Sequence, residues 1–132
     1  MAYNLFISHS WTYGEYYDGL LRLLNDHPTF LYNNYSIPKN NPIHNATNDA
    51  QLKAAIRNKM QHASCVVILA GVYASYSKWI KIEIELAKEM NKRIIAVAPW
   101  GAERTSSVVK QAAHQIVRWN TASIVNAIRG YM

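Results

Sequence analysis

Residues 65–69 read Cys65-Val66-Val67-Ile68-Leu69, an unbroken apolar run. Such a run is typical of a central strand in a parallel sheet, because helices cover that strand on both faces. A second run of the same type is Arg93-Ile94-Ile95-Ala96-Val97-Ala98. A longer stretch with helical character separates the two runs, so together they indicate a strand–helix–strand unit.

The same alternation extends toward both ends of the chain. We expect further strands at residues 3–8, 29–32 and 115–119, and helices at residues 13–25, 49–61, 105–114 and 121–129. Residues 33–48 contain two prolines and many asparagines, so we predict a long loop there.

Strands that alternate with helices imply a parallel sheet with right-handed crossovers. The predicted fold is therefore α/β and flavodoxin-like, with a doubly wound five-stranded sheet, strand order 2-1-3-4-5 and helices on both faces. We expect residues 1–132 to form a single domain. Ligands of such sheets bind beyond the carboxyl ends of the strands, so the loops at that edge are where we expect a site.

Composition excludes several classes of protein. Half of the 132 residues are hydrophobic and 17% are charged, which is typical of a folded globular chain. The one cysteine, Cys65, lies in an apolar strand and excludes an internal disulfide and a thiolate metal site. The histidines show no metal-ligand spacing, so no metal is predicted. The sequence contains no glycine-rich phosphate loop and no nucleophile elbow.

Localisation and partners follow from hydropathy and charge. No apolar run approaches the roughly 20 residues of a membrane span, and the N-terminus lacks a signal-peptide pattern, so we expect a cytoplasmic protein. The formal net charge of +6 favours anionic partners. Because no cluster of basic residues resembles a nucleic-acid arm or a polybasic membrane patch, we predict neither nucleic-acid nor membrane binding. Both a solvated basic surface and a phosphate-bearing ligand such as a dinucleotide fit this pattern.

One segment, Trp79-Ile80-Lys81-Ile82-Glu83-Ile84-Glu85-Leu86, fits two structures. Its alternation of apolar and polar residues is typical of a strand. The helix formers at residues 87–90 and an N-cap candidate at Ser77 favour a helix, which we predict. On a helical wheel Glu83 then lies near the middle of the apolar face, whereas Glu85 lies outside it. A carboxylate among apolar side chains is costly unless it is paired or used.

Several motifs, taken in their order and spacing, resemble those of TIR domains. Leu5-Phe6-Ile7-Ser8-His9-Ser10 resembles their first strand, and residues 73–79 followed by Glu83 resemble the segment that carries their catalytic glutamate. His9-Ser10-Trp11 and the ending Val117-Arg118-Trp119-Asn120 are more similar to a TIR-like branch first seen in an archaeal protein. That branch includes the TIR subunits of the bacterial Thoeris antiphage system.

The resemblance implies an enzyme that cleaves NAD⁺, either an NAD⁺ nucleosidase or an ADP-ribosyl cyclase-like hydrolase or transferase. NAD⁺ would be its substrate, and no further cofactor is implied. Glu83 would be the catalytic residue. The residues implied in substrate binding are Phe6, Ser8, His9, Ser10, Trp11, Tyr73 and Trp79. An ADP-ribose-derived product would activate a separate effector in antiphage defence, with self-association or an infection-derived activator as the trigger.

The residues themselves are compatible with this chemistry. Nicotinamide leaves NAD⁺ as a neutral ring, so its departure needs no general acid, and an anion near the ribose stabilises a cationic transition state. Glu83 and Trp79 are four residues apart, so they share one helix face. The alternative is a non-catalytic TIR-like adaptor that self-associates, because a fold does not settle function. A receiver-like regulator is a weaker alternative, since Ser8-His9-Ser10 stands where its acidic cluster would be.

Overall fold

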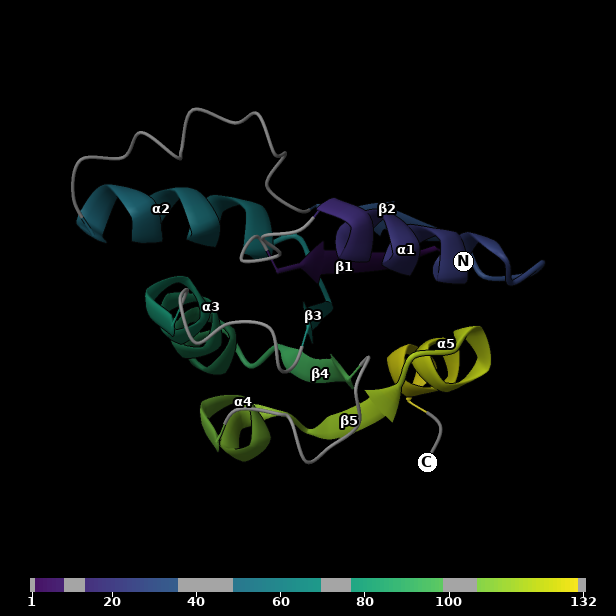
Figure 1. Ribbon diagram of the computed structural model, residues 1–132. Helices are drawn as coiled ribbons and strands as arrows, with labels where there is room; N and C mark the ends of the chain where they lie inside the picture. Colours follow the sequence, from purple (N-terminus) through teal and green to yellow (C-terminus); the bar gives the residue numbers. More distant parts are fainter. Residues whose placement is uncertain (1, 9–13, 36–48, 70–76, 99–106, 131–132) are drawn as a thin grey trace.

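The computed structural model describes residues 2–8, 14–35, 49–69, 77–98 and 107–130. Strands and helices alternate throughout this part of the chain (Figure 1). In chain order the elements are β1 (Tyr3–Ile7), α1 (Gly14–Asn25), β2 (Tyr32–Asn34), α2 (Asp49–Met60), β3 (Cys65–Leu69), α3 (Ser77–Glu89), β4 (Arg93–Ala98), α4 (Ser107–Ala112), β5 (Gln115–Arg118) and α5 (Thr121–Arg129). Within the same residues no helix is long and apolar enough to cross a membrane.

The five strands form one sheet in the order β2-β1-β3-β4-β5, and every pair in it is parallel. This confirms the predicted fold class and strand order. β3 lies at the centre, where Leu5 of β1 is in register with Cys65 and Val66 is in register with Ile94 of β4. The two apolar runs that indicated the fold are therefore neighbours in the middle of the sheet.

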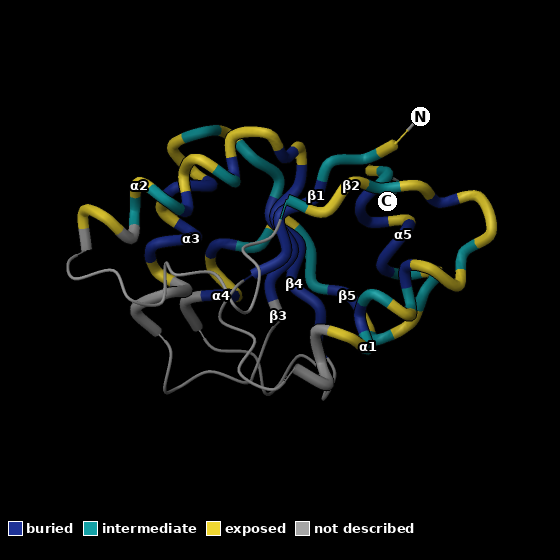
Figure 2. Tube along the Cα trace, turned by 90° about the horizontal axis from the view of Figure 1, so that it is seen from above, coloured by how far each residue is buried: buried dark blue, intermediate teal, exposed yellow. Residues whose placement is uncertain are grey.

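The helices cover both faces of the sheet. Figure 2 shows α1 and α5 on one side of the strands and α2, α3 and α4 on the other, with the buried strands between them. The apolar faces of the helices complete the core, which includes Leu20 and Leu24 of α1, Ile56 of α2 and Leu86 of α3, all with no exposed surface. A helix layer on each face is why β3 and β4 need no polar side to turn toward water.

The helix after β5 shows how sequence signals fix an element. α5 begins after Asn120, whose side-chain oxygen accepts a hydrogen bond from the amide of Ser123 at 2.8 Å. It ends at Gly130, which has a φ of 85° and closes the last turn in the left-handed conformation. The bounds predicted for this helix are confirmed, as are those predicted for β4.

The second strand differs from its prediction. We expected residues 29–32, but β2 spans Tyr32–Asn34, because the chain before it turns. The side chain of His27 accepts a hydrogen bond from the amide of Thr29 at 3.2 Å, and Phe30 is buried against the ring of Tyr3 with centroids 5.5 Å apart. Polar residues can form this strand because it is the edge of the sheet and needs only backbone pairing on one side.

Candidate active site

The candidate site is built on α3, which carries Glu83. The segment that fitted both a strand and a helix is helical, as predicted, and the helix begins at Ser77 itself. The helical wheel predicted correctly which side chains of α3 are buried. The buried residues are Ile82, Glu83, Ile84, Leu86 and Ala87, and the exposed ones are Lys81, Glu85 and Lys88. Glu83 has no solvent-exposed surface at all. The alternation of apolar and polar residues reflects the wide apolar face of this helix rather than a pleated strand.

Ser8 lies at the carboxyl end of β1. Its amide donates a hydrogen bond to the carbonyl of Val67 in β3 at 2.8 Å, which continues the parallel ladder one residue beyond the strand. The ladder fixes the backbone of Ser8, and its side chain is 1% exposed. Ser8 and Glu83 are the buried polar or charged residues in the part of the chain that the structure describes.

These two buried side chains are bonded to each other. The Ser8 hydroxyl donates a hydrogen bond to Oε1 of Glu83 with an oxygen–oxygen distance of 2.6 Å, across 75 residues of sequence. Distances of this length are typical of a hydroxyl that donates to a charged acceptor. A buried carboxylate is expensive unless polar groups replace its water, and the Ser8 hydroxyl is one such group. The result is a carboxylate held at the sheet edge where ligands of such folds bind.

The remaining predicted site residues divide into two groups. Phe6 lies in β1 in register with Val66, and its side chain is fully buried in the hydrophobic core. Trp79 lies in the first turn of α3, but its side chain is outside the described part of the structure. Also outside the described residues are His9, Ser10, Trp11 and Tyr73. Their roles in binding a substrate stay predictions.

The geometry gives Ser8 a role that the sequence reasoning missed. We predicted Ser8 as a substrate contact, which stays a prediction, and the structure shows that its hydroxyl donates a hydrogen bond to Glu83. A polar residue at the end of the apolar stretch Leu5-Phe6-Ile7 is a signal that could have indicated a buried polar pair. Among the described residues no group of three or more histidine, cysteine, aspartate or glutamate side chains is arranged to hold a metal.

Comparisons with known proteins add the family. A model of the Thoeris protein ThsB, TIR-like domain, matches residues 6–104. The chain belongs to this family. The ThsB-type match includes both Ser8 and Glu83, and ends before β5 and α5. The comparison with curated proteins gave no match.

Among solved structures, the ThsB-type chain is similar to the CMP N-glycosidase BcmB of Clostridium botulinum. The TM-score is 0.53 and the sequence identity 16%, with 97% of this chain and 99% of that chain covered. At this level of identity the likeness supports the shared fold and nothing finer. The fold of this ThsB-type chain is thus one that also occurs in an enzyme acting on an N-glycosidic bond.

Proposed function

We propose that this chain cleaves the bond between nicotinamide and ribose in NAD⁺. The observation that carries the proposal is the fully buried Glu83 carboxylate, held by the Ser8 hydroxyl at 2.6 Å beside the carboxyl end of β1. Its place on α3, four residues after Trp79, is the place that the resemblance to TIR domains implies for the catalytic glutamate. Membership of the ThsB family supports the same reading.

The reaction follows from charge. The C1′–N bond breaks, and its electron pair stays with the pyridinium nitrogen, so nicotinamide leaves as a neutral ring. Positive charge then develops on the ribose, where it is absent in the bound substrate. A preorganised anion beside the ribose favours this transition state over the ground state, which is what raises the rate. The ribosyl centre is finally captured by water or another nucleophile, which gives up a proton.

Burial is what distinguishes this proposal from a silent adaptor. An adaptor needs shape and surface charge, whereas Glu83 lies inside the molecule, where an apolar residue of similar size would fold at lower cost. A carboxylate kept in a costly environment is a candidate for a functional residue. On α3 itself, Glu85 and Glu89 are exposed and pair with lysine and arginine of α2, which is how charged residues serve a surface.

A nucleotide N-glycosidase is the second candidate, because the similar solved structure is named a CMP N-glycosidase. The two substrates differ in whether the base needs a proton in order to leave. Cytosine is neutral in CMP and leaves as an anion unless an acid protonates it, whereas nicotinamide needs no such acid. Oε1 of Glu83 accepts a hydrogen bond from the Ser8 hydroxyl, and a serine hydroxyl is a poor acid, so this pair does not supply a proton for cytosine. NAD⁺ is therefore the substrate that we expect, and CMP is the substrate to test against it.

Within a Thoeris-like defence system, we propose that the product is a signalling molecule derived from ADP-ribose. The chain would then act by producing a ligand for a separate effector rather than by touching that effector. This assignment rests on the family alone. It implies that the protein releases its product, and that its turnover responds to an infection-derived activator or to self-association.

The test compares two glutamates on one helix. We expect Glu83→Gln to lower NAD⁺ turnover by about 100- to 1000-fold, the usual loss for one preorganised electrostatic group. Glutamine keeps an oxygen that can accept from Ser8, so we expect folding to be retained. Glu85→Gln is the matched control, because Glu85 is exposed and its ion pair with Lys53 is 3.6 Å long. It should change turnover by less than about twofold.

The assay incubates each protein with NAD⁺ or CMP, with and without extract from phage-infected cells, and identifies products by mass spectrometry. Release of nicotinamide by the parent and the Glu85 variant, but not by Glu83→Gln, is the expected result. Release of cytosine instead would replace the first candidate by the second. Equal losses in the two variants would sink the role given to Glu83, and a parent that is inactive in every condition would favour the adaptor.

A further inference from the structure

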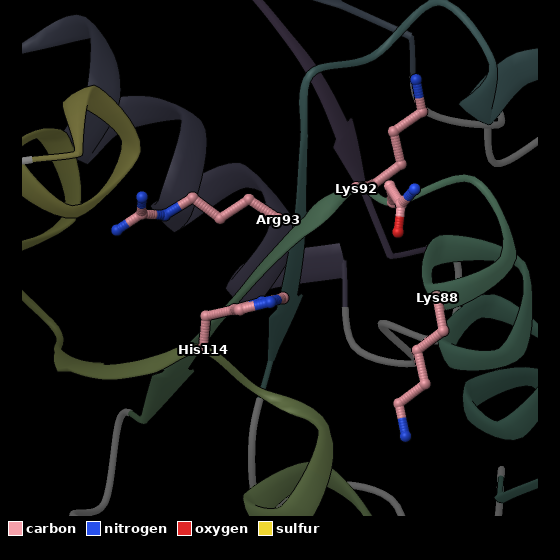
Figure 3. A pocket seen from close by; sticks show the side chains of 5 residues that line it. Lys88, Lys92, Arg93 and His114 are labelled. Atoms are coloured by element: carbon pink, nitrogen blue, oxygen red, sulfur yellow. The ribbon is translucent and has the colours of Figure 1, made fainter.

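A second polar feature lies at the other edge of the sheet, where the strands begin. A pocket with a volume of about 390 Å³ is lined there by Lys88, Asn91, Lys92, Arg93 and His114 (Figure 3). Lys88 is in the last turn of α3, Arg93 is the first residue of β4, and His114 precedes β5. This volume falls within the range typical of small-ligand sites.

Three formal positive charges surround this pocket, and the nearest carboxylates on α3 are engaged elsewhere. Glu89 pairs with Arg57 at 3.0 Å, on the side of α3 that faces α2. Within the described residues, Lys88, Lys92 and Arg93 form no ion pair with a carboxylate. The charge around the pocket is therefore not compensated by this part of the protein, and it favours an anion.

The cations of Lys92 and Arg93 have neutral partners. The Lys92 ammonium donates to the carbonyl of Gln61 at 3.1 Å, and Nη2 of Arg93 donates to Oε1 of Gln115 at 3.3 Å. Neither acceptor cancels the charge. Nε of Arg93 is shielded from solvent and has no hydrogen-bond partner among the described residues. A shielded donor without a partner is unusual in a folded protein, and an acceptor bound at this edge of the sheet would satisfy it.

His114 supplies a donor whose proton is fixed. Its Nδ1 accepts a hydrogen bond from the amide of Ile94 at 3.0 Å, so in the neutral ring the proton is on Nε2. In Figure 3 the imidazole of His114 comes from the residue before β5 and the side chain of Lys88 comes from α3, while the terminal groups of Lys92 and Arg93 point away from Lys88. The side chains of His114 and Lys88, together with the side-chain amide of Asn91, which also lines the pocket, are the groups that a ligand there would contact.

Lysines at the end of a helix often serve only to balance its dipole. Here the last turn of α3 is already capped by backbone groups. The amide of Asn91 donates to the carbonyl of Lys88 at 3.1 Å, and the amide of Lys92 donates to the carbonyl of Ala87 at 2.8 Å. Asn91 has a φ of 55°, which completes a Schellman motif. The lysine side chains are therefore not needed to satisfy these carbonyls.

We propose that this pocket binds a phosphate group, either as inorganic phosphate or as part of a nucleotide. The ammonium of Lys88, the side-chain amide of Asn91 and Nε2–H of His114 donate to its oxygens, and Lys92 and Arg93 add attraction from the flanks. Tetrahedral oxyanions suit such a mixed set of donors, because each oxygen accepts several hydrogen bonds. The site is separate from Glu83, so it does not depend on the function proposed above.

The experiment follows the backbone amides of the full ¹⁵N-labelled chain by NMR during a titration with sodium phosphate, at constant ionic strength set by sodium chloride. We expect saturable shifts at Asn91, Lys92, Arg93 and His114, and none at Ser8. A parallel titration with CMP and with uncharged cytidine separates the two sources of phosphate. Tighter binding of CMP points to a nucleotide, and equal binding points to phosphate alone, while cytidine should not bind.

Lysine variants test the contacts. Lys88→Ala combined with Lys92→Ala should weaken phosphate binding by about tenfold or more, since charge-assisted hydrogen bonds are the strong ones. Lys88→Gln, which removes the charge but keeps a polar side chain of nearly the same length, serves if the double variant unfolds. Lys110→Ala, an exposed lysine in the last turn of α4, is the control and should bind as the parent does. Shifts that do not saturate, or equal losses in the Lys88 and Lys110 variants, would overturn the proposal.

Discussion

Replacing Ser8 with alanine removes the hydroxyl that donates to Glu83 and leaves every other atom of the pair in place. The bond is 2.6 Å long, Ser8 is 1% exposed and Glu83 is not exposed at all, so water does not replace the lost donor without a rearrangement. A hydrogen bond to a charged group contributes about 1.5–3 kcal/mol, and about 1 kcal/mol when both partners are neutral. We therefore expect Ser8→Ala to lower the free energy of unfolding by about 2 kcal/mol.

The same change made in the Glu83→Gln background should cost only about 1 kcal/mol, because the acceptor there is neutral. Urea unfolding of the parent, the two single variants and the double variant gives the coupling free energy directly. Ser64→Ala is the matched control, since the Ser64 hydroxyl also donates across the sheet, to the carbonyl of Asn4 at 3.2 Å, but is exposed. We expect a loss of less than about 1 kcal/mol there.

Turnover gives a second, independent readout. If Ser8 positions Glu83, Ser8→Ala should lower kcat by about 10- to 100-fold, which corresponds to the loss of 1.5–3 kcal/mol of hydrogen bonding. The acid limb of the pH–rate profile should also move to higher pH, because a donor to the charged form has been removed. Equal unfolding costs in the two backgrounds, together with an unchanged pH profile, would refute the idea that Ser8 acts through Glu83.

Four further predictions concern the reactivity of Cys65 and the stability of the fold. Burial raises the pKa of the Cys65 thiol from 9.0 to about 12, against a smaller opposing effect of Arg93, so alkylation of the native protein should be slow at pH 8 and fast in denaturant. The folded pKa exceeds the unfolded one, so this contribution to stability should be complete below about pH 9 and be lost as the pH rises toward about 12, as pH-dependent urea unfolding would show. Gly130→Ala should cost about 1 kcal/mol in the same assay, because the φ of 85° is unfavourable for alanine. Arg57→Ala should cost no more than about 0.5 kcal/mol, because both partners of its ion pair with Glu89 are half exposed; a loss several times larger would show a network.

The sheet could be predicted from the sequence because its signals are local and repeated. Val66, Val67 and Ile68 are apolar without interruption because both faces of β3 are covered, and each of them is fully buried. The bounds of α5 were predicted correctly, with Gly130 as the signal for its end, and the structure adds Asn120 as its N-cap. β2 was displaced because Phe30 has strand propensity but is used to fill the core beside Tyr3, and a burial partner from another element is not visible in a local pattern.

The candidate site was predictable in part. The position of Glu83 on the apolar face follows from 100° per residue, and its burial confirms that step. The bond to Ser8 could not be predicted in the same way, because it depends on how closely α3 approaches the end of β1, which no periodicity encodes. The pocket around Lys88 and His114 was missed for a similar reason. Lys88, the adjacent pair Lys92 and Arg93, and His114 are spread over 27 residues of sequence and gather only where β4 and β5 begin.

The span of the Ser8–Glu83 bond has a consequence for how the protein matures. The two residues are 75 positions apart, and they meet only after β1, β3 and α3 have all docked. Contacts of this range form late and slowly in parallel sheets, because long stretches of chain must be closed first. When only β1 and α1 of the growing chain have left the ribosome, α3 has not yet emerged, so the Glu83 carboxylate is not in place beside Ser8. Any turnover that depends on Glu83 therefore requires β1, β3 and α3 to be docked, and copies in which they have not docked would be inactive.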